Sequence, residues 1–179
     1  GPTIHPQAPS ATEDLAYKYK TRWIVSDRPD RYRRGMYIHF KRTNPYPSLL
    51  MFDGPESNVC QAVRNRSNTP LQALVTLNDP VFVECARALG RDLAIASGDH
   101  FRRFDRLGQR TLSRRFTRQE TRILESLFEA EHKWYRDHSQ EAGQAVGEYA
   151  TVSSDNAATA AWTAVARAIL NLDEFVTRE

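Results

Sequence analysis

Cysteines and long apolar runs are scarce in this sequence of 179 residues. Cys60 and Cys85 are its only cysteines, and neither belongs to a CxxC or CxxCH motif. The sequence patterns of zinc ribbons, dithiol redox centres and covalently attached haem are therefore excluded from this chain. An exported protein would allow a Cys60–Cys85 disulfide, but we favour the interpretation that both are buried free thiols. No apolar run reaches the about 18 residues of a transmembrane helix, so we expect no membrane span.

Common catalytic motifs are also missing. No HExxH, GxSxG, phosphate-loop or GxGxxG pattern occurs. The histidines are scattered, and no two of them lie on one helix at a metal-ligand spacing together with an acid. We therefore predict no metal site and no cofactor in this chain, and we assign no catalytic residue. The five histidines are His5, His39, His100, His132 and His138.

Lysine is rare although the chain is basic, with a formal net charge of +3. Only four of its 25 basic residues are lysines, and the others are arginines. A GC-rich genome would produce this bias through its codons. Selection for planar guanidinium groups that bind carboxylate, sulfate or phosphate would produce it as well. The net charge does not separate these two explanations.

Proline divides the chain into two unlike parts of what we predict to be a single domain, residues 1–179. Seven of the nine prolines lie in residues 1–68, which we expect to form an irregular wrapping segment. Two short segments rich in β-branched and aromatic residues, 21–26 and 35–40, allow a short β-hairpin there. Residues 69–179 contain two prolines and have helical periodicity almost throughout, which predicts a helical bundle.

The segment KRTNPYPSLLMFDGP, residues 41–55, is predicted to be a stiff strap. Its prolines at 45, 47 and 55 are expected to prevent regular structure and to favour extended backbone. If this segment crosses the helical part, its apolar side chains should be largely buried and its charged ones should lie at the polar edge. The apolar set consists of Tyr46, Leu49, Leu50 and Phe52.

Start and stop signals predict about five helices, and the fold class is therefore mainly α. The first follows a cap at Asn68 or Thr69 and has an inward face of Leu71, Leu74, Val75 and Leu77. The second begins at Pro80, with Val81, Cys85, Leu89 and Leu93 on one stripe, and continues to Gly98. The third spans residues 100–114 with Phe101, Phe104, Leu107 and Leu112 inward. The fourth begins at a Thr117–Glu120 capping box, and its packed residues are Ile123, Leu124, Leu127, Phe128 and Tyr135. Residues 140–154 are predicted to form a polar loop, after which Asp155 caps the last helix.

Basic and aromatic residues gather in the irregular first part and are the best candidates for a ligand site. Such groups bind nucleic acid through phosphate contacts and base stacking, and they equally bind acidic or sulfated glycans. The alternative is structural, with arginines donating to backbone carbonyls and pairing with nearby acids. Asp53, before Gly54-Pro55, either takes part in acid–base chemistry or caps a turn. The candidate ligand-binding residues are Arg33, Arg34, Lys41, Arg42, Tyr46, Asp53, Arg64 and Arg66.

Three stretches carry a resemblance to a known family. They are DRYRRGMYIHFKRTNPYPSLLMFDGPESNVC, RNRSNTPLQALVTLNDPVFVECARAL and AAWTAVARAILNLDEFVTRE. Together they resemble the planctomycete-type domain of unknown function 1553, the C-terminal module of large secreted proteins. The resemblance implies export to the periplasm or cell surface, with upstream domains of the same polypeptide as partners. It also implies that a companion domain of unknown function 1549, and a cytochrome-c-like domain with haem, can precede this chain.

Two functions follow as hypotheses. The first is a non-catalytic helical module that docks onto upstream domains of a secreted multidomain protein. The second is a contribution to the active site or binding cleft of an exported oxidoreductase, with haem in another domain, or of a protein that processes anionic polysaccharide. Nucleic-acid binding is disfavoured because the resemblance implies export. We expect no turnover of simple glycans or esters by residues 1–179 alone.

Overall fold

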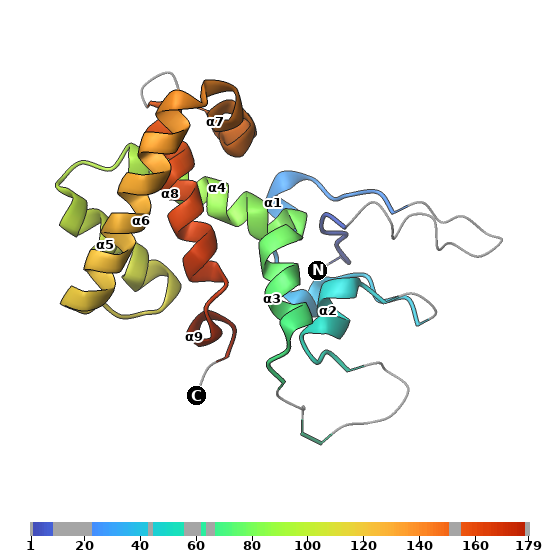
Figure 1. Ribbon diagram of the computed structural model, residues 1–179. Coiled ribbons are helices and arrows are strands. Elements are labelled where there is room, and N and C mark those ends of the chain that lie inside the picture. The colour runs from blue at the N-terminus through green and yellow to red at the C-terminus, as the bar shows by residue number, and fades with distance from the viewer. Residues whose placement is uncertain are drawn as a thin grey trace. The chain divides into compact units, whose positions relative to one another are not determined.

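The computed structural model describes residues 2–8, 23–42, 45–55, 62–63, 67–150 and 155–177. Its regular structure is helical, which confirms the prediction of a mainly α fold (Figure 1). Contacts group the chain into two compact units, Gly1–Val81 and Phe82–Glu179. The single domain over residues 1–179 stays a prediction.

The N-terminal unit contains short helices joined by irregular segments. These are α1 (Arg28–Arg31), the 3-10 helix η2 (Gly35–Tyr37), α2 (Pro47–Met51) and α3 (Pro70–Asn78). The hairpin between 21–26 and 35–40 is not formed by the described residues of these segments. Ile38 instead makes an isolated parallel bridge with Ile4, because the N–H groups of Ile4 and His39 donate to the carbonyls of Tyr37 and Ile4.

The prediction that residues 41–55 lack regular structure is wrong over Pro47–Met51. Pro47 occupies the start of α2, where its fixed φ favours the helix and its missing N–H costs nothing. The helix ends after one turn, and Asp53 then takes the left-handed conformation with φ of 55°. Burial follows the prediction for Tyr46 only, because Leu49, Leu50 and Phe52 are half-buried.

Helix α3 begins as predicted, but its inward face differs. Thr69 is the N-cap, and its hydroxyl and the Gln72 side chain form a reciprocal capping box. The predicted inward residues Leu71 and Leu74 are 59% and 56% exposed, whereas Gln72 and Thr76 are buried. The side-chain amide of Gln72 occupies the inner face of α3 because its Nε2 donates a hydrogen bond to the Met51 carbonyl at 2.8 Å.

The C-terminal unit is a bundle around α8 (Asn156–Leu170). Figure 1 shows α6 running beside α8 and α7 at one end of it, and both helices pack against α8. Trp162 on α8 is fully buried, with its ring centroids 4.6 Å from Phe128 and 5.0 Å from Phe104. The other elements are α4 (Pro80–Ala94), α5 (His100–Thr111), α6 (Arg118–Asp137), α7 (Ser139–Val146), η3 (Gly147–Tyr149) and α9 (Asp173–Val176).

Small residues bring α4 close to α8. A Cβ at Gly90 would lie 2.7 Å from the backbone nitrogen of Thr163, which is closer than real Cβ contacts. Ala157, Ala160 and Ala161 of α8 are buried as well. Small side chains on both helices thus permit the close packing of α4 and α8.

Local signals predicted helix starts better than helix lengths or faces. The Thr117–Glu120 capping box and the cap at Asp155 are confirmed. Residues 140–154 were predicted to form a polar loop but include most of α7 and all of η3. Helix α7 forms because its sequence, SQEAGQAV, consists largely of residues that tolerate a helix. It ends at Gly147, which has a φ of 57°. The second and third helices end at Ala94 and Thr111, earlier than predicted. Besides Leu71 and Leu74, three residues predicted to face inward are exposed: Cys85, Phe101 and Ile123. Burial of the thiol is therefore wrong for Cys85, and Cys60 lies outside the described residues.

Candidate functional site

The predicted basic residues of the N-terminal unit are divided between structural contacts and solvent. The Arg33 guanidinium carbon lies 4.1 Å from the centroid of the Tyr37 ring, and its Nη1 donates to the Pro2 carbonyl at 3.1 Å. Arg33 therefore bonds a ring and a backbone carbonyl, as the structural alternative requires. Arg34 and Arg42 are exposed and Lys41 is half-buried. The remaining two, Arg64 and Arg66, lie outside the described residues.

Tyr46 is an anchor of the unit. It is 5% exposed, its hydroxyl donates to the Gln7 carbonyl at 2.7 Å, and its ring stacks on Trp23 with centroids 5.8 Å apart. Burial, with a smaller contribution from Asp79, raises the pKa of Tyr46 to about 12. The phenol is therefore neutral at physiological pH and serves packing rather than proton transfer.

Asp53 lies in the turn after α2 and connects it to the segment before α3. Its carboxylate accepts hydrogen bonds of 2.8 Å from the Ser67 backbone N–H and of 2.8 and 3.0 Å from the Ser67 hydroxyl. Gln72 Nε2 donates to the same Ser67 oxygen at 3.0 Å. Asp53, Ser67 and Gln72 thus form one network that fixes α3 by its polar face.

A second polar link, between Ser48 and Asp79, was not predicted. The Ser48 hydroxyl donates to Oδ2 of the buried Asp79 at 2.8 Å, and the Val81 N–H donates to its other carboxylate oxygen at 2.9 Å. Asp79 therefore caps α4 and also holds α2. The partner on α2 lies 31 residues earlier, and no local pattern identifies it.

Two histidines that sequence reasoning left as scattered lie together in this unit. The ring centroids of His5 and His39 are 5.0 Å apart, and Trp23 packs edge-on against His5 at 4.7 Å. Burial, and then the neighbouring His39, lower the pKa of His5. Their separation of 34 positions left no spacing signal that could have paired them.

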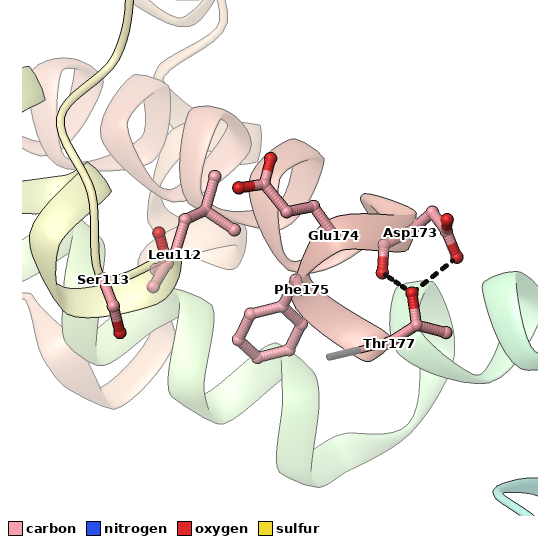
Figure 2. Close-up of a pocket in the computed structure, with 7 residues that line it drawn as sticks. Leu112, Ser113, Asp173, Glu174, Phe175 and Thr177 are labelled. Atoms are coloured by element: carbon pink, nitrogen blue, oxygen red, sulfur yellow. Dashed lines mark hydrogen bonds between the residues drawn. The ribbon is translucent and has the colours of Figure 1, made fainter. Parts of the chain in front are cut away.

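The C-terminal unit contains a groove of about 640 Å³ between the turn after α5 and helix α9 (Figure 2). Leu112 and Phe175 supply apolar surface, and Asp173 and Glu174 supply carboxylates. Thr177 Oγ1 donates to the backbone and side-chain oxygens of Asp173 at 2.9 and 3.1 Å. The described lining residues include hydroxyls and carboxylates but no histidine, cysteine or lysine, so they contain no familiar pair of nucleophile and base.

Arg114 fixes α9 beside this groove. Its guanidinium donates to both oxygens of Glu174, at 2.6 and 2.7 Å, and to both oxygens of Glu120, at 3.0 and 2.8 Å. Hydrogen bonding to both carboxylates raises the pKa of Arg114. In return, Arg114 lowers the pKa of Glu174 and, with the backbone of Thr117, lowers that of Glu120 to about 2. Of the two carboxylates that Arg114 bonds, only Glu174 lines the groove.

A family model described as "Protein of unknown function (DUF1553)" matches residues 1–128. The chain belongs to this family. The match includes the whole N-terminal unit and continues to Phe128 of α6, which confirms the family predicted from the sequence. Comparisons with curated proteins and with solved structures give no match.

In this DUF1553 chain, the described residues contain no group of three or more His, Cys, Asp or Glu side chains placed to hold a metal. Among the helices of the described part, none has the length and apolarity that crossing a membrane requires. The predicted site residues are thus distributed over several small polar networks, and the described ones do not converge on one catalytic centre.

Proposed function

We propose that this DUF1553 chain is a non-catalytic helical module that docks onto a preceding domain of the same exported polypeptide. The observation that carries the proposal is the distribution of apolar side chains over the two units.

The N-terminal unit buries few apolar side chains. Among the described residues before Phe82, Ile4 and Tyr46 are the buried hydrophobic ones, whereas all three hydrophobic clusters of the described residues lie in the C-terminal unit. Because apolar burial is the main favourable term in folding, this unit gains little from it. Contiguous exposed apolar surface commonly marks an interaction site. Its exposed large hydrophobic residues are Ile24, Val25, Tyr32, Met36, Met51, Val63, Leu71 and Leu74.

Leu71 and Leu74 of helix α3 are the best-defined of these exposed residues. They lie one turn apart on the outer side of α3, while the Asp53, Ser67 and Gln72 network holds its inner side. Pro70–Asn78 contains no charged residue. A surface that covers α3 must therefore be apolar and uncharged at this point, as the centres of stable interfaces are.

A preceding domain of the same polypeptide is the proposed occupant. The family resemblance supports this choice, since relatives place a companion domain before this module. Tethering also favours it, because a linked partner binds at a high effective concentration even when the shared surface is small. A second copy of this chain is the competing occupant.

The test uses the complete polypeptide with a protease site introduced just before Gly1. After cleavage, we expect the two parts to elute together in size-exclusion chromatography. The pair Leu71→Asp and Leu74→Asp should weaken this association at least tenfold, since burying a leucine is worth about 1.5–3 kcal/mol. Ile123→Asp, at an exposed position on α6, is the matched control and should leave it unchanged.

Three results would contradict the proposal. The first is separation of the two parts of the unmodified protein after cleavage. The second is equal association of the Leu71→Asp, Leu74→Asp variant and the control. The third is a dimer of residues 1–179 that the leucine substitutions dissociate, which would assign α3 to self-association.

Binding of an anionic glycan is a second candidate, favoured by the pairing of arginines with aromatic rings. Arg33 lies over Tyr37, and Arg31 lies 5.2 Å from the centroid of the exposed Tyr32 ring. Rings stack on sugar faces, and the exposed Arg34 and Arg42 could bind sulfate or carboxylate groups nearby. Any chemistry, including that of a haem, would then belong to another domain.

Elution from an immobilised sulfated polysaccharide tests this candidate. Arg34→Ala with Arg42→Ala should elute at lower salt than the unmodified chain, whereas Arg122→Ala, at an exposed position on α6, should elute with it. Equal shifts for both variants would indicate nonspecific attraction by net charge and would eliminate the candidate.

A further inference from the structure

The N-terminal segment, residues 2–8, is held against several other parts of its unit. It forms a parallel bridge with Ile38, and side chains from two further segments bond its backbone. The hydrogen bonds join the Ser26 N–H to the His5 carbonyl at 2.9 Å, the His5 N–H to Ser26 Oγ at 2.9 Å, Trp23 Nε1 to the Pro6 carbonyl at 2.7 Å, and the Tyr46 hydroxyl to the Gln7 carbonyl at 2.7 Å.

Two imidazoles meet where this segment is attached. His5 lies on the segment and His39 lies beside the bridge, with their rings tilted by 30° and 5.0 Å apart. Trp23 packs edge-on against His5 and stacks in turn on Tyr46. Both histidines are half-buried, so water screens their charges less than on an open surface.

The surroundings of His5 favour its neutral form. Burial, and then the neighbouring His39, lower the pKa of His5, and no carboxylate of the described residues offsets them. The other ionisable groups facing the segment are Arg33, which donates to the Pro2 carbonyl, Tyr37 at the bridge, and Tyr46, which stays neutral. Two imidazolium ions at this separation would repel each other, and burial disfavours each of them.

We propose that His5, packed against His39, is a pH-sensitive latch, which holds the N-terminal segment while the His5 ring is neutral and releases it when that ring is protonated. The sign follows from linkage: the released state binds protons more readily than the held state. The held state is therefore favoured above the ordinary imidazole pKa of about 6.5 and loses this advantage as the pH falls below it. Release would uncover Ile4 and Trp23. This inference is independent of the proposed docking function.

Hydrogen exchange of the backbone amides of Ile4, Ser26 and His39 tests the latch, because these N–H groups donate the bonds that attach the segment. Exchange rates are measured by NMR at pH 7.5 and 5.0. The protection factor of each amide is the rate of an unstructured peptide at the same pH divided by the measured rate. We expect the protection factors to fall about tenfold between the two pH values, because acid favours the released state, which binds protons more readily. His39→Gln should reduce this fall to less than about threefold. His138→Gln, in the C-terminal unit, should leave it intact.

Several results would overturn the latch. The first is a protection factor that does not change with pH. The second is a fall of the protection factor in His39→Gln as large as in the unmodified chain. The third is the absence of protection of these amides at pH 7.5 in the unmodified chain. The His39→Gln variant can lose the attachment at pH 7.5 while the unmodified chain keeps it. In that case the pKa of His5 in the unmodified chain, measured by NMR titration, tests the latch. A His5 pKa below 6.5 then supports the latch, and a value at or above 6.5 refutes it.

Discussion

Arg114 donates two hydrogen bonds to Glu174, from Nε at 2.6 Å and from Nη2 at 2.7 Å. The same guanidinium bonds Glu120, so a single side chain joins α9 to the first turn of α6. Helix α9 has four residues and is too short to be stable alone. Its position therefore depends on this two-sided ion pair and on the packing of Phe175.

Arg114→Ala should release α9 without unfolding the bundle. The pair is partly exposed, and exposed ion pairs contribute little to global stability, so the thermal midpoint should fall by no more than about 4 °C. The amides of α9 should nevertheless exchange faster in NMR experiments. Arg115→Ala, whose ion pair with Asp105 spans 3.7 Å and is more exposed, is the matched control and should leave α9 protected.

Low pH should reduce the stability of the fold, partly through protonation of Glu120. Its pKa is lowered from 4.5 to about 2, so its contribution to stability is complete above pH 4.5 and is lost as the pH falls toward 2. Urea unfolding at pH 6, 4 and 3 should show a steeper loss for the unmodified chain than for Glu120→Gln, which keeps the capping box but not the charge. Identical pH profiles for the two proteins would rule out this contribution, and Glu125→Gln controls for the change in net charge.

Phe104 and Phe101 form a matched pair on one helix. Phe104 is 1% exposed and belongs to the hydrophobic cluster around Trp162. Phe104→Ala should lower the free energy of unfolding by about 3–5 kcal/mol through the cavity it leaves. Phe101 is 56% exposed, and Phe101→Ala should change stability by about 0.5 kcal/mol or less. Denaturant unfolding measures both, and comparable losses would show that the burial of α5 is assigned to the wrong face.

Gly90 and Gly143 are a second matched pair, because both lie within helices of the C-terminal unit. Gly90→Ala places a methyl group against the backbone of Thr163, so it should destabilise the unit by about 1–3 kcal/mol. A Cβ at Gly143 meets nothing within 4 Å, so Gly143→Ala should stabilise α7 by about 0.5–1 kcal/mol. Thermal melts distinguish the two, and a stabilising Gly90→Ala would contradict the close approach of α4 and α8.

Signals confined to a few neighbouring residues were the predictable part of this fold. Thr69, Thr117 and Asp155 each cap a helix through a backbone N–H two or three positions later, and this geometry depends on local sequence alone. The family was predictable for a similar reason, since its motifs are contiguous in the chain.

Contacts between distant segments were not predictable in the same way. Apolar periodicity placed Leu71 and Leu74 inside, but hydrogen bonds from Gln72 to Met51 and Ser67 determine which side of α3 faces inward. Likewise, no periodicity relates His5 to His39, because their proximity comes from a bridge between non-helical segments. The candidate residues Arg33 and Asp53 contact the Pro2 carbonyl and Ser67, respectively, and their role in ligand binding stays a prediction.

The position of the core has a consequence for biosynthesis. A ribosome releases residues 1–81 before most of the apolar side chains that pack together have been made, and within the described part of that stretch only Ile4 and Tyr46 become buried hydrophobic residues. Helix α8, which supplies Trp162, Val165 and Ile169 to the hydrophobic cluster around Trp162, emerges after the other long helices of the described residues. Folding of residues 1–179 should therefore begin in the C-terminal unit and only after α8 has been made, which is the reverse of the usual order in which N-terminal parts fold first.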